Sequence, residues 1–284
     1  MNPSTRRPLH ALGAAAVLVL PALAHAAPFE CLLEPAQTVE IRSAVEGLIH
    51  RIHVQRGDDV RAGQVLVELD ASVERSAAAA ARYRAQAEGR VEASRNRMQY
   101  ANRKTQRSNE LHSQNYISSQ ARDEAETEKN LAESELKEAM ENKELARLDH
   151  QRAIDLLNQK TLRSPFNGIV VDRMLNPGDL AEAGNGRKPI LKLAQIHPLR
   201  VETVLPLSTF GKLRPGMVGN VTPEGGTPYK ATIKVVDRVL DAASGTYGVR
   251  LELPNPQGQL PGGIRCQVDF PDLSGVAQTS HRAR

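Results

Sequence analysis

The sequence predicts an α+β fold: a β-sandwich split by a long antiparallel α-helical coiled-coil hairpin and followed by a small β-barrel. Three observations predict it. The same spacing of glycines occurs twice, far apart in the chain. A proline-free segment rich in alanine and charged residues separates the two copies, and several short strand-like segments, divided by glycine and proline, follow the second copy.

The repeated pattern occupies residues 44–70 and 164–194, and in each copy strand-like apolar runs alternate with turn residues. Every glycine of the first copy recurs 121 positions later: Gly47, Gly57 and Gly63 correspond to Gly168, Gly178 and Gly184. We interpret these six glycines as structural turns. Because a piece of about 30 residues cannot bury a sufficient core alone, the two copies are expected to pair as halves of one flattened β-sandwich.

Residues 71–163, between the halves, are predicted to form the hairpin. They contain no proline and one glycine, and they are rich in residues that favour helix. The chain is expected to reverse at HSQNYISSQ, near Asn115, between two helices of about 40 residues, each about 60 Å long. Small residues recur at heptad spacing and predict the seam between the arms. The seam residues are Val73, Ala77, Ala80, Ala87, Val91, Ser94, Met98, Ala101, Thr105 and Ser108 in the first arm, and Ala125, Lys129, Ala132, Leu136, Ala139, Lys143, Ala146, His150, Ala153 and Leu157 in the second.

The second β-rich region comprises residues 195–273, where short strand-like segments are separated by turn residues at regular spacing. We expect it to form a small β-barrel, to which residues 27–43 contribute the remaining strand or strands. Residues 274–284 have the composition of a disordered tail.

The first 26 residues read as a secretory signal peptide, with Arg6 and Arg7 ahead of an apolar run and Ala24-His25-Ala26 as the cleavage site. The alternative is a retained signal anchor. Export would bring Cys31 and Cys266 into an oxidising compartment, where they could form a disulfide. The alternative for these two cysteines is a pair of buried thiols.

Charge and aromatic content argue against nucleic acid as a partner. The formal net charge is +4, the arginines are interleaved with glutamates, and aromatic residues make up 3% of the chain. We identify no reacting centre, metal site or cofactor site: His50 and His53 point to opposite faces of a predicted strand, and no phosphate loop, nucleophile elbow or paired-cysteine signature occurs. The chain is therefore not expected to be an enzyme.

The two β-halves resemble those of biotinyl and lipoyl carrier domains, in which a lysine at the turn between the halves carries the cofactor. Here Leu69-Asp70-Ala71 leads into the predicted hairpin with no lysine. A carrier domain of an enzyme complex is thus disfavoured, and a covalent lipoyl or biotin adduct detected by mass measurement would establish it.

The order of a signal peptide, a split lipoyl-like domain, a helical hairpin and a β-barrel resembles the periplasmic adaptor family of tripartite efflux systems, the HlyD-like membrane fusion proteins. The resemblance covers most of residues 36–273. It implies a periplasmic protein held at the inner membrane by its partner, a homo-oligomeric ring of three or six copies, an inner-membrane transporter and a TolC-like outer-membrane channel. Small-molecule efflux with a resistance-nodulation-division (RND) transporter is favoured, because a cleaved signal without a retained span is more typical of its adaptors. The alternative is a type I secretion or ABC exporter adaptor for polypeptides or other cargo. Unlike longer members of the family, the sequence shows no complete membrane-proximal domain after the barrel.

The predicted hairpin tip extends the resemblance. In adaptors that bind TolC-like channels the tip has an Arg, then a Leu four positions later and a Ser seven positions after that. RSNELHSQNYIS places Arg107, Leu111 and Ser118 at this spacing, which implies that they bind the channel. The alternative is that Arg107 is only solvated and Ser118 only caps the second helix.

Overall fold

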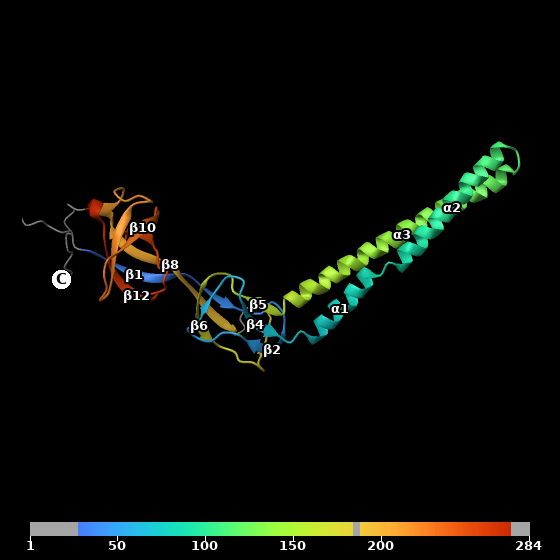
Figure 1. Cartoon of the computed structure of the whole chain (residues 1–284). Coiled ribbons are helices and arrows are strands. Elements are labelled where there is room, and N and C mark those ends of the chain that lie inside the picture. The colour runs from blue at the N-terminus through green and yellow to red at the C-terminus, as the bar shows by residue number, and fades with distance from the viewer. Residues whose placement is uncertain (1–27, 184–187, 274–284) are drawn as a thin grey trace, which may run out of the picture. The chain divides into compact units, whose positions relative to one another are not determined.

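The computed structural model describes residues 28–183 and 188–273 (Figure 1). The predicted signal peptide, the predicted tail and Gly184 lie outside the described residues. The chain forms two compact units. The barrel unit contains residues 28–34, 200–254 and 263–273, and the sandwich and hairpin unit contains residues 35–183, 188–199 and 255–262.

The barrel unit is a closed ring of six strands in the described residues, in the order β1-β12-β9-β10-β11-β8, with β8 pairing back to β1. The strands are β1 (Phe29–Ile41), β8 (Leu191–Pro206), β9 (Val218–Pro223), β10 (Tyr229–Val236), β11 (Thr246–Leu253) and β12 (Ile264–Asp269). Short 3-10 turns follow β8 at Leu207–Thr209 and β12 at Pro271–Leu273. Alternate side chains point inward, and the core includes Leu33, Val201, Leu205, Val221, Ile233, Leu251, Val268 and Phe270. The first strand, β1, is part of the ring.

The sandwich is built from both copies of the repeat. Its strands are β2 (Gly47–Ile52), β3 (Asp59–Val60), β4 (Val65–Leu69), β5 (Thr161–Arg163), β6 (Gly168–Arg173), β7 (Leu180–Ala181) and the first part of β8. One sheet has the order β5-β4-β2-β7, and β3, β6 and β8 pair in the other. In the first sheet β7 of the second half pairs with β2, and in the other β3 of the first half pairs with β6. The halves are thus exchanged into each other's sheets, and they share one apolar core.

The described glycines of the repeat serve two different physical needs. Gly57, Gly63 and Gly178 have φ values of +92°, +79° and +93°, a backbone region that other residues adopt only with strain. Gly168 is needed for close packing, because a Cβ there would lie 2.3 Å from the carbonyl oxygen of Ala194. At Gly47 a Cβ would lie 3.3 Å from the Leu69 side chain, so that contact is tight rather than impossible.

The hairpin consists of α1 (Ser72–Gln86), α2 (Gly89–Ser113) and α3 (Ser119–Asn158), with α1 and α2 packed in succession along α3 (Figure 1). The prediction of one continuous first helix is wrong, because the helix is broken at Ala87 and Glu88, and Ala87 has an extended backbone. The break moves the α1 seam by one position. Ala78 and Ala81 are buried, whereas the predicted Ala77 and Ala80 are exposed.

Beyond the break the predicted seam matches the burial pattern. Val91, Ala101 and Thr105 are the buried residues of α2, and Ala125, Ala132 and Ala139 are those of α3. Small side chains at these positions let the two helix backbones approach closely. None of the helices in the described residues combines the length and apolar character that a membrane span requires.

Candidate functional site: the tip of the helical hairpin

The hairpin tip is a tightly hydrogen-bonded reversal. Helix α2 ends at Ser113, and Asn115 adopts a left-handed conformation with φ of 60°. The N–H of Asn115 donates to the carbonyl of His112, and the N–H of Tyr116 donates to the carbonyl of Leu111, both at 2.9 Å. This pair of bonds around a left-handed residue is a common way to satisfy the last carbonyls of a helix. It fixes the direction in which the chain leaves α2.

Ser118 begins the return helix. Its backbone is extended, and its hydroxyl oxygen accepts a 3.2 Å hydrogen bond from the N–H of Ala121, the geometry of a helix N-cap. The capping interpretation of Ser118 therefore holds in the structure. It does not exclude a second contact, since the hydroxyl can still donate its proton.

The other two predicted tip residues lie on the last turns of α2. Arg107 is exposed and, among the described residues, forms no ion pair. Its guanidinium carries N–H donors that a partner could use. Leu111 is 42% exposed despite being apolar, and Tyr116, which the sequence analysis did not single out, is 74% exposed. The tip thus presents two apolar side chains and a free guanidinium on a fixed backbone.

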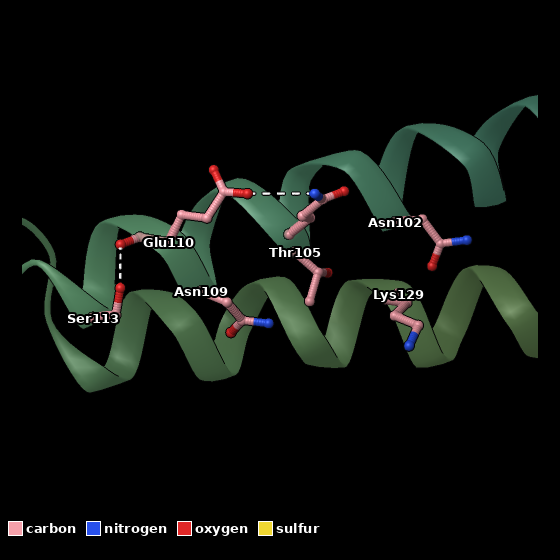
Figure 2. Close-up of a pocket in the computed structure, with 7 residues that line it drawn as sticks. Asn102, Thr105, Asn109, Glu110, Ser113 and Lys129 are labelled. Atoms are coloured by element: carbon pink, nitrogen blue, oxygen red, sulfur yellow. Dashed lines mark hydrogen bonds between the residues drawn. The ribbon is translucent and has the colours of Figure 1, made fainter.

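A shallow polar groove of about 440 Å³ runs beside the tip (Figure 2). Figure 2 shows amide and hydroxyl side chains from α2 facing it, with Lys129 of α3 on the other side. Gln106 donates to Glu110 at 3.3 Å, and the Ser113 hydroxyl donates to the Glu110 carbonyl at 2.7 Å. The groove offers hydrogen bonds at helical spacing rather than an enclosed site for a small molecule. Its lining residues are Asn102, Thr105, Gln106, Asn109, Glu110, Ser113 and Lys129.

Polar contacts between the arms hold the hairpin in one register. The buried Thr105 hydroxyl lies 3.0 Å from the Ala101 carbonyl of its own helix and 2.8 Å from the Ala125 carbonyl of α3. Lys104 pairs with Glu128 at 2.6 Å. That hydrogen bond raises the pKa of Lys104.

Two further ion pairs cross the hairpin farther from the tip. Arg97 pairs with Glu135 at 3.1 Å, and Lys143 pairs with Glu88 at 2.6 Å. The hydrogen bond from Lys143 lowers the pKa of Glu88, the residue at the break between α1 and α2. These pairs define the register of the first arm, α1 and α2, against α3.

The root of the hairpin depends on Lys160, which the sequence analysis did not identify. Its ammonium group lies 3.0 Å from the Glu74 carboxylate and donates a 3.2 Å hydrogen bond to the carbonyl of Glu46. It therefore joins the start of α1, the end of the return arm and the segment before β2. The hydrogen bond from Lys160 lowers the pKa of Glu74. A lone lysine among many helical charges gave no sequence signal of this role.

The remaining predicted residues lie away from the tip. Cys31 and Cys266 occupy opposite positions of β1 and β12 and are joined by a disulfide. His53 lies 3.0 Å from Glu68. Within residues 28–183 and 188–273 no cluster of three His, Cys, Asp or Glu side chains could hold a metal ion.

Two buried serines that the sequence analysis missed also recur at the repeat distance, one directly before the first copy and one at the start of the second. Ser43 donates its hydroxyl to the carbonyl of Val45, and Ser164, 121 positions later, donates to the carbonyl of Phe166 at 2.7 Å. The sequence signal that could have identified these two residues is that a serine recurs 121 positions later.

Comparison with known proteins places the chain in a family. Residues 37–186 match the model of a "CzcB-like, barrel-sandwich hybrid domain". The pyoverdine export membrane fusion protein PvdR of Pseudomonas aeruginosa is 28% identical over 209 residues, which cover 72% of this chain and 52% of PvdR. The multidrug export protein AcrE of Escherichia coli K12 is 25% identical over 265 residues, covering 86% of this chain and 65% of AcrE.

The fold has relatives among solved structures. The crystal structure of MacA from Actinobacillus actinomycetemcomitans superimposes with a TM-score of 0.72 at 21% identity, covering 86% of this chain and 77% of MacA. The chain spans between about half and two thirds of the length of the curated relatives named above. Because the family model matches more than half of the residues of this chain, the chain belongs to the membrane fusion proteins that carry a CzcB-like barrel-sandwich hybrid domain.

Proposed function

We propose that the chain is a non-enzymatic periplasmic adaptor that couples an inner-membrane transporter to a TolC-like outer-membrane channel for the efflux of small molecules. In this proposal the chain assembles into a ring of three or six copies, and an RND transporter supplies the energy. The names of the relatives PvdR and AcrE, both export proteins, support efflux. That this chain shares the partners and cargo of these relatives is part of the proposal.

The hairpin tip is the observation that carries the proposal. Leu111 and Tyr116 are exposed apolar side chains at the end of a long hairpin, where burial in a second protein would remove their surface from water. The reversal between them is held by two backbone hydrogen bonds and the Ser118 cap. A surface of this kind binds with little loss of backbone entropy, because its conformation is already fixed.

Arg107 supplies the polar part of the proposed contact. Its guanidinium has no carboxylate partner among the described residues, so it can donate to carbonyl or carboxylate oxygens of a channel without breaking an existing ion pair. Leu111 lies one turn farther along α2 and would fill an apolar groove between two channel helices. In the proposal Ser118 keeps its cap and adds its hydroxyl proton to the contact.

The proposal is tested by site-specific crosslinking from the tip to an outer-membrane channel in cells. Leu111→Asp is expected to reduce the crosslinking yield at least tenfold, since a buried, unpaired carboxylate costs several kcal/mol. Met140→Asp is the matched control, because Met140 is similarly exposed on α3 but far from the tip. Equal crosslinking by the wild type and Leu111→Asp would remove the tip from the proposed function.

Ser118 is tested with a pair of variants that separates its two roles. Ser118→Asp preserves a good N-cap, whereas Ser118→Ala removes it. If the hydroxyl also contacts the channel, both variants lose crosslinking although only Ser118→Ala loses helix stability. Loss of crosslinking in Ser118→Ala alone would assign Ser118 to capping.

A further inference from the structure

Exposed apolar side chains gather at one end of the barrel. At this end β8 and β10 finish while β9 and β11 start, because β9, β10 and β11 pair antiparallel in succession and the N–H of Leu207 donates a 3.0 Å hydrogen bond to the carbonyl of Gly245. Seven of the eight large apolar side chains that are exposed in the described part of the barrel unit lie here. Three are on the outer wall, at Val204, Val218 and Val235. The other four, which we call the apolar loops, lie between strands: Leu207, Phe210, Val239 and Leu240.

The apolar loops are held together as one surface. The rings of Phe210 and Tyr247 make an edge contact with their centroids 5.3 Å apart, and the hydroxyls of Thr209 and Tyr247 lie 2.8 Å apart. The N–H of Asp241 donates a 3.0 Å hydrogen bond to the carbonyl of Thr246, which closes the loop between β10 and β11. Because these loops make hydrogen bonds within the barrel, moving them out of water leaves fewer polar groups unpaired.

Three basic side chains flank the apolar loops. Lys212 and Arg214 lie between the 3-10 turn Leu207–Thr209 and β9, and Arg238 directly precedes Val239. All three are exposed and form no ion pair among the described residues. Their charges are therefore available to an anionic partner beside the apolar side chains, the combination that is typical of surfaces that bind anionic lipids.

The two acidic side chains of the loop between β10 and β11 lie close to backbone. The Asp241 carboxylate accepts hydrogen bonds from the N–H of Ala243 at 2.9 Å and the N–H of Ser244 at 3.3 Å. The Asp237 carboxylate lies against Gly248, where an added Cβ would clash with it. The three unpaired cations therefore determine the charge beside the apolar loops, and that charge favours an anionic partner.

The chain also enters the barrel at this end. Phe29, the first residue of β1, pairs with Val268, and the adjacent Asp269 pairs with Asn220 near the start of β9. The apolar run of the predicted secretory signal, residues 11–20, lies upstream of Phe29. A signal retained as an anchor would hold this end of the barrel at the bilayer. A cleaved signal would leave that contact to the apolar loops alone.

We propose that this end of the barrel binds an anionic lipid surface directly. In this contact the apolar loops enter the boundary between headgroups and acyl chains, while Lys212, Arg214 and Arg238 contact lipid phosphates. Val239, which is 89% exposed, projects from the surface, and a lipid surface accommodates such a side chain without a matching groove. The inference goes beyond the proposed function, in which the bilayer is contacted only through the transporter.

The test uses tryptophan fluorescence, because the chain contains no tryptophan and an introduced one reports only its own surroundings. Val239→Trp is compared with Val73→Trp, the matched control, since Val73 is a valine that is 75% exposed on α1. Each is purified as the chain that cells export, with its N-terminus identified by mass spectrometry. Each is then mixed with vesicles made of equal parts of phosphatidylglycerol and phosphatidylcholine. The fluorescence of Val239→Trp alone is expected to shift to the blue and to be quenched by brominated acyl chains.

A second set of variants measures binding by sedimentation with the same vesicles. Val239→Asp is expected to bind at least tenfold less than wild type, since a carboxylate would have to leave water, whereas Val73→Asp should match wild type. Arg238→Gln should bind about fivefold less, the weight of one basic residue near an anionic surface. Vesicles of phosphatidylcholine alone should bind wild type more weakly, and equal binding to both kinds of vesicle would overturn the requirement for an anionic lipid.

The fluorescence results separate lipid from other partners. A blue shift and quenching confined to Val239→Trp support the inference. Equal shifts at both positions would assign binding to another part of the chain and overturn it, as would no shift at either position. A photocrosslinker at position 239 that captures a protein in cells, with no vesicle binding, would assign the apolar loops to a protein partner and overturn lipid binding.

The experiment contains neither channel nor transporter. Failure to bind vesicles together with normal crosslinking of the hairpin tip in cells would remove lipid binding and leave the proposed function in place. Vesicle binding without tip crosslinking would have the reverse meaning.

Discussion

The backbone N–H of Gly57 donates a 2.8 Å hydrogen bond to the carbonyl of Val170, in the other half of the sandwich. The equivalent bond of the second half runs from Gly178 to the carbonyl of Ile49 at 2.9 Å. Both donors and both acceptors are separated by the 121-residue repeat distance. The two halves therefore bind each other through the same contacts used twice, which is the physical reason that the glycine pattern is repeated.

The repeat glycines are expected to differ in how much stability they contribute. Gly168→Ala places a Cβ against the Ala194 carbonyl and should destabilise the chain by about 3 kcal/mol. Gly57→Ala has free space but a left-handed φ, so a loss of about 1–2 kcal/mol is expected. Urea unfolding monitored by circular dichroism measures both.

Gly89→Ala provides the control for these two variants. Gly89 is helical, and a Cβ added there would have nothing within 4 Å, so its replacement should change stability by less than about 1 kcal/mol. If all three variants lost equal stability, neither the close approach at Gly168 nor the φ of Gly57 would explain the repeat.

Asn115 is predicted to determine the stability of the hairpin reversal. Asn115→Gly should be neutral or stabilising, because glycine adopts a left-handed φ without strain. Asn115→Ala should cost about 1 kcal/mol for the same reason. Thermal unfolding followed by far-UV circular dichroism compares the two, and a more stable Asn115→Ala would show that the left-handed cap is unimportant.

Reduction of the Cys31–Cys266 disulfide is predicted to destabilise the barrel unit. The bond closes a loop across a sequence separation of 235, and loss of such a native bridge costs about 2–5 kcal/mol. Wild type should unfold at a lower urea concentration in the presence of dithiothreitol. A Cys31→Ala, Cys266→Ala double variant should match reduced wild type and should not respond to the reductant; any response of that variant would trace the effect to something other than the disulfide.

The ion pair at the hairpin root should make stability depend on pH. The hydrogen bond from Lys160 lowers the pKa of Glu74 in the folded chain, so folding favours the ionised carboxylate. The contribution is fully present above the pKa of an unfolded-chain glutamate, about 4.3, and is lost as the pH falls through the lower folded pKa. Thermal unfolding as a function of pH measures this loss.

Glu74→Gln is the variant that isolates this effect. It should be less stable than wild type at neutral pH, and the difference should shrink in acid as wild-type Glu74 becomes protonated. Glu144→Gln is the matched control, since among the described residues Glu144 forms its ion pair with Arg147, one turn away on the same exposed helix. Parallel stability curves for wild type and Glu74→Gln would rule out the root pair as a source of pH dependence.

The sequence was most informative where a regular pattern reflects a direct physical need. The repeated glycines predicted two halves that pair, and the small residues of the second arm predicted the α3 seam, because burial between helices requires small side chains at that spacing. The break at Ala87 and Glu88 was not predicted, since both are good helix formers. The adjacent Gly89, the one glycine of residues 71–163, was the local signal, and a long-range ion pair between Glu88 and Lys143 accompanies the break.

The candidate site, too, was predicted from the sequence only in part. Arg107, Leu111 and Ser118 were predicted from the spacing in the tip, and the structure adds that Ser118 is an N-cap. Tyr116 and Lys160 were missed for a physical reason. Exposure at a reversal and contacts between distant segments depend on tertiary structure, and neither leaves a local pattern.

The exchange of strands between the sandwich halves has a consequence for biosynthesis. Strands β2 and β3 have their partners β7 and β6 more than a hundred residues downstream, so a nascent chain that has not yet reached residue 168 carries half of a core with nothing to cover it. Formation of the hairpin first would bring the two halves together and replace a long flexible loop by a short one. The α-helices would then act as a template for closing the β-domain. The chain would be most prone to aggregation while residues 72–168 are being synthesised or translocated, because the first half of the sandwich then lacks its partner.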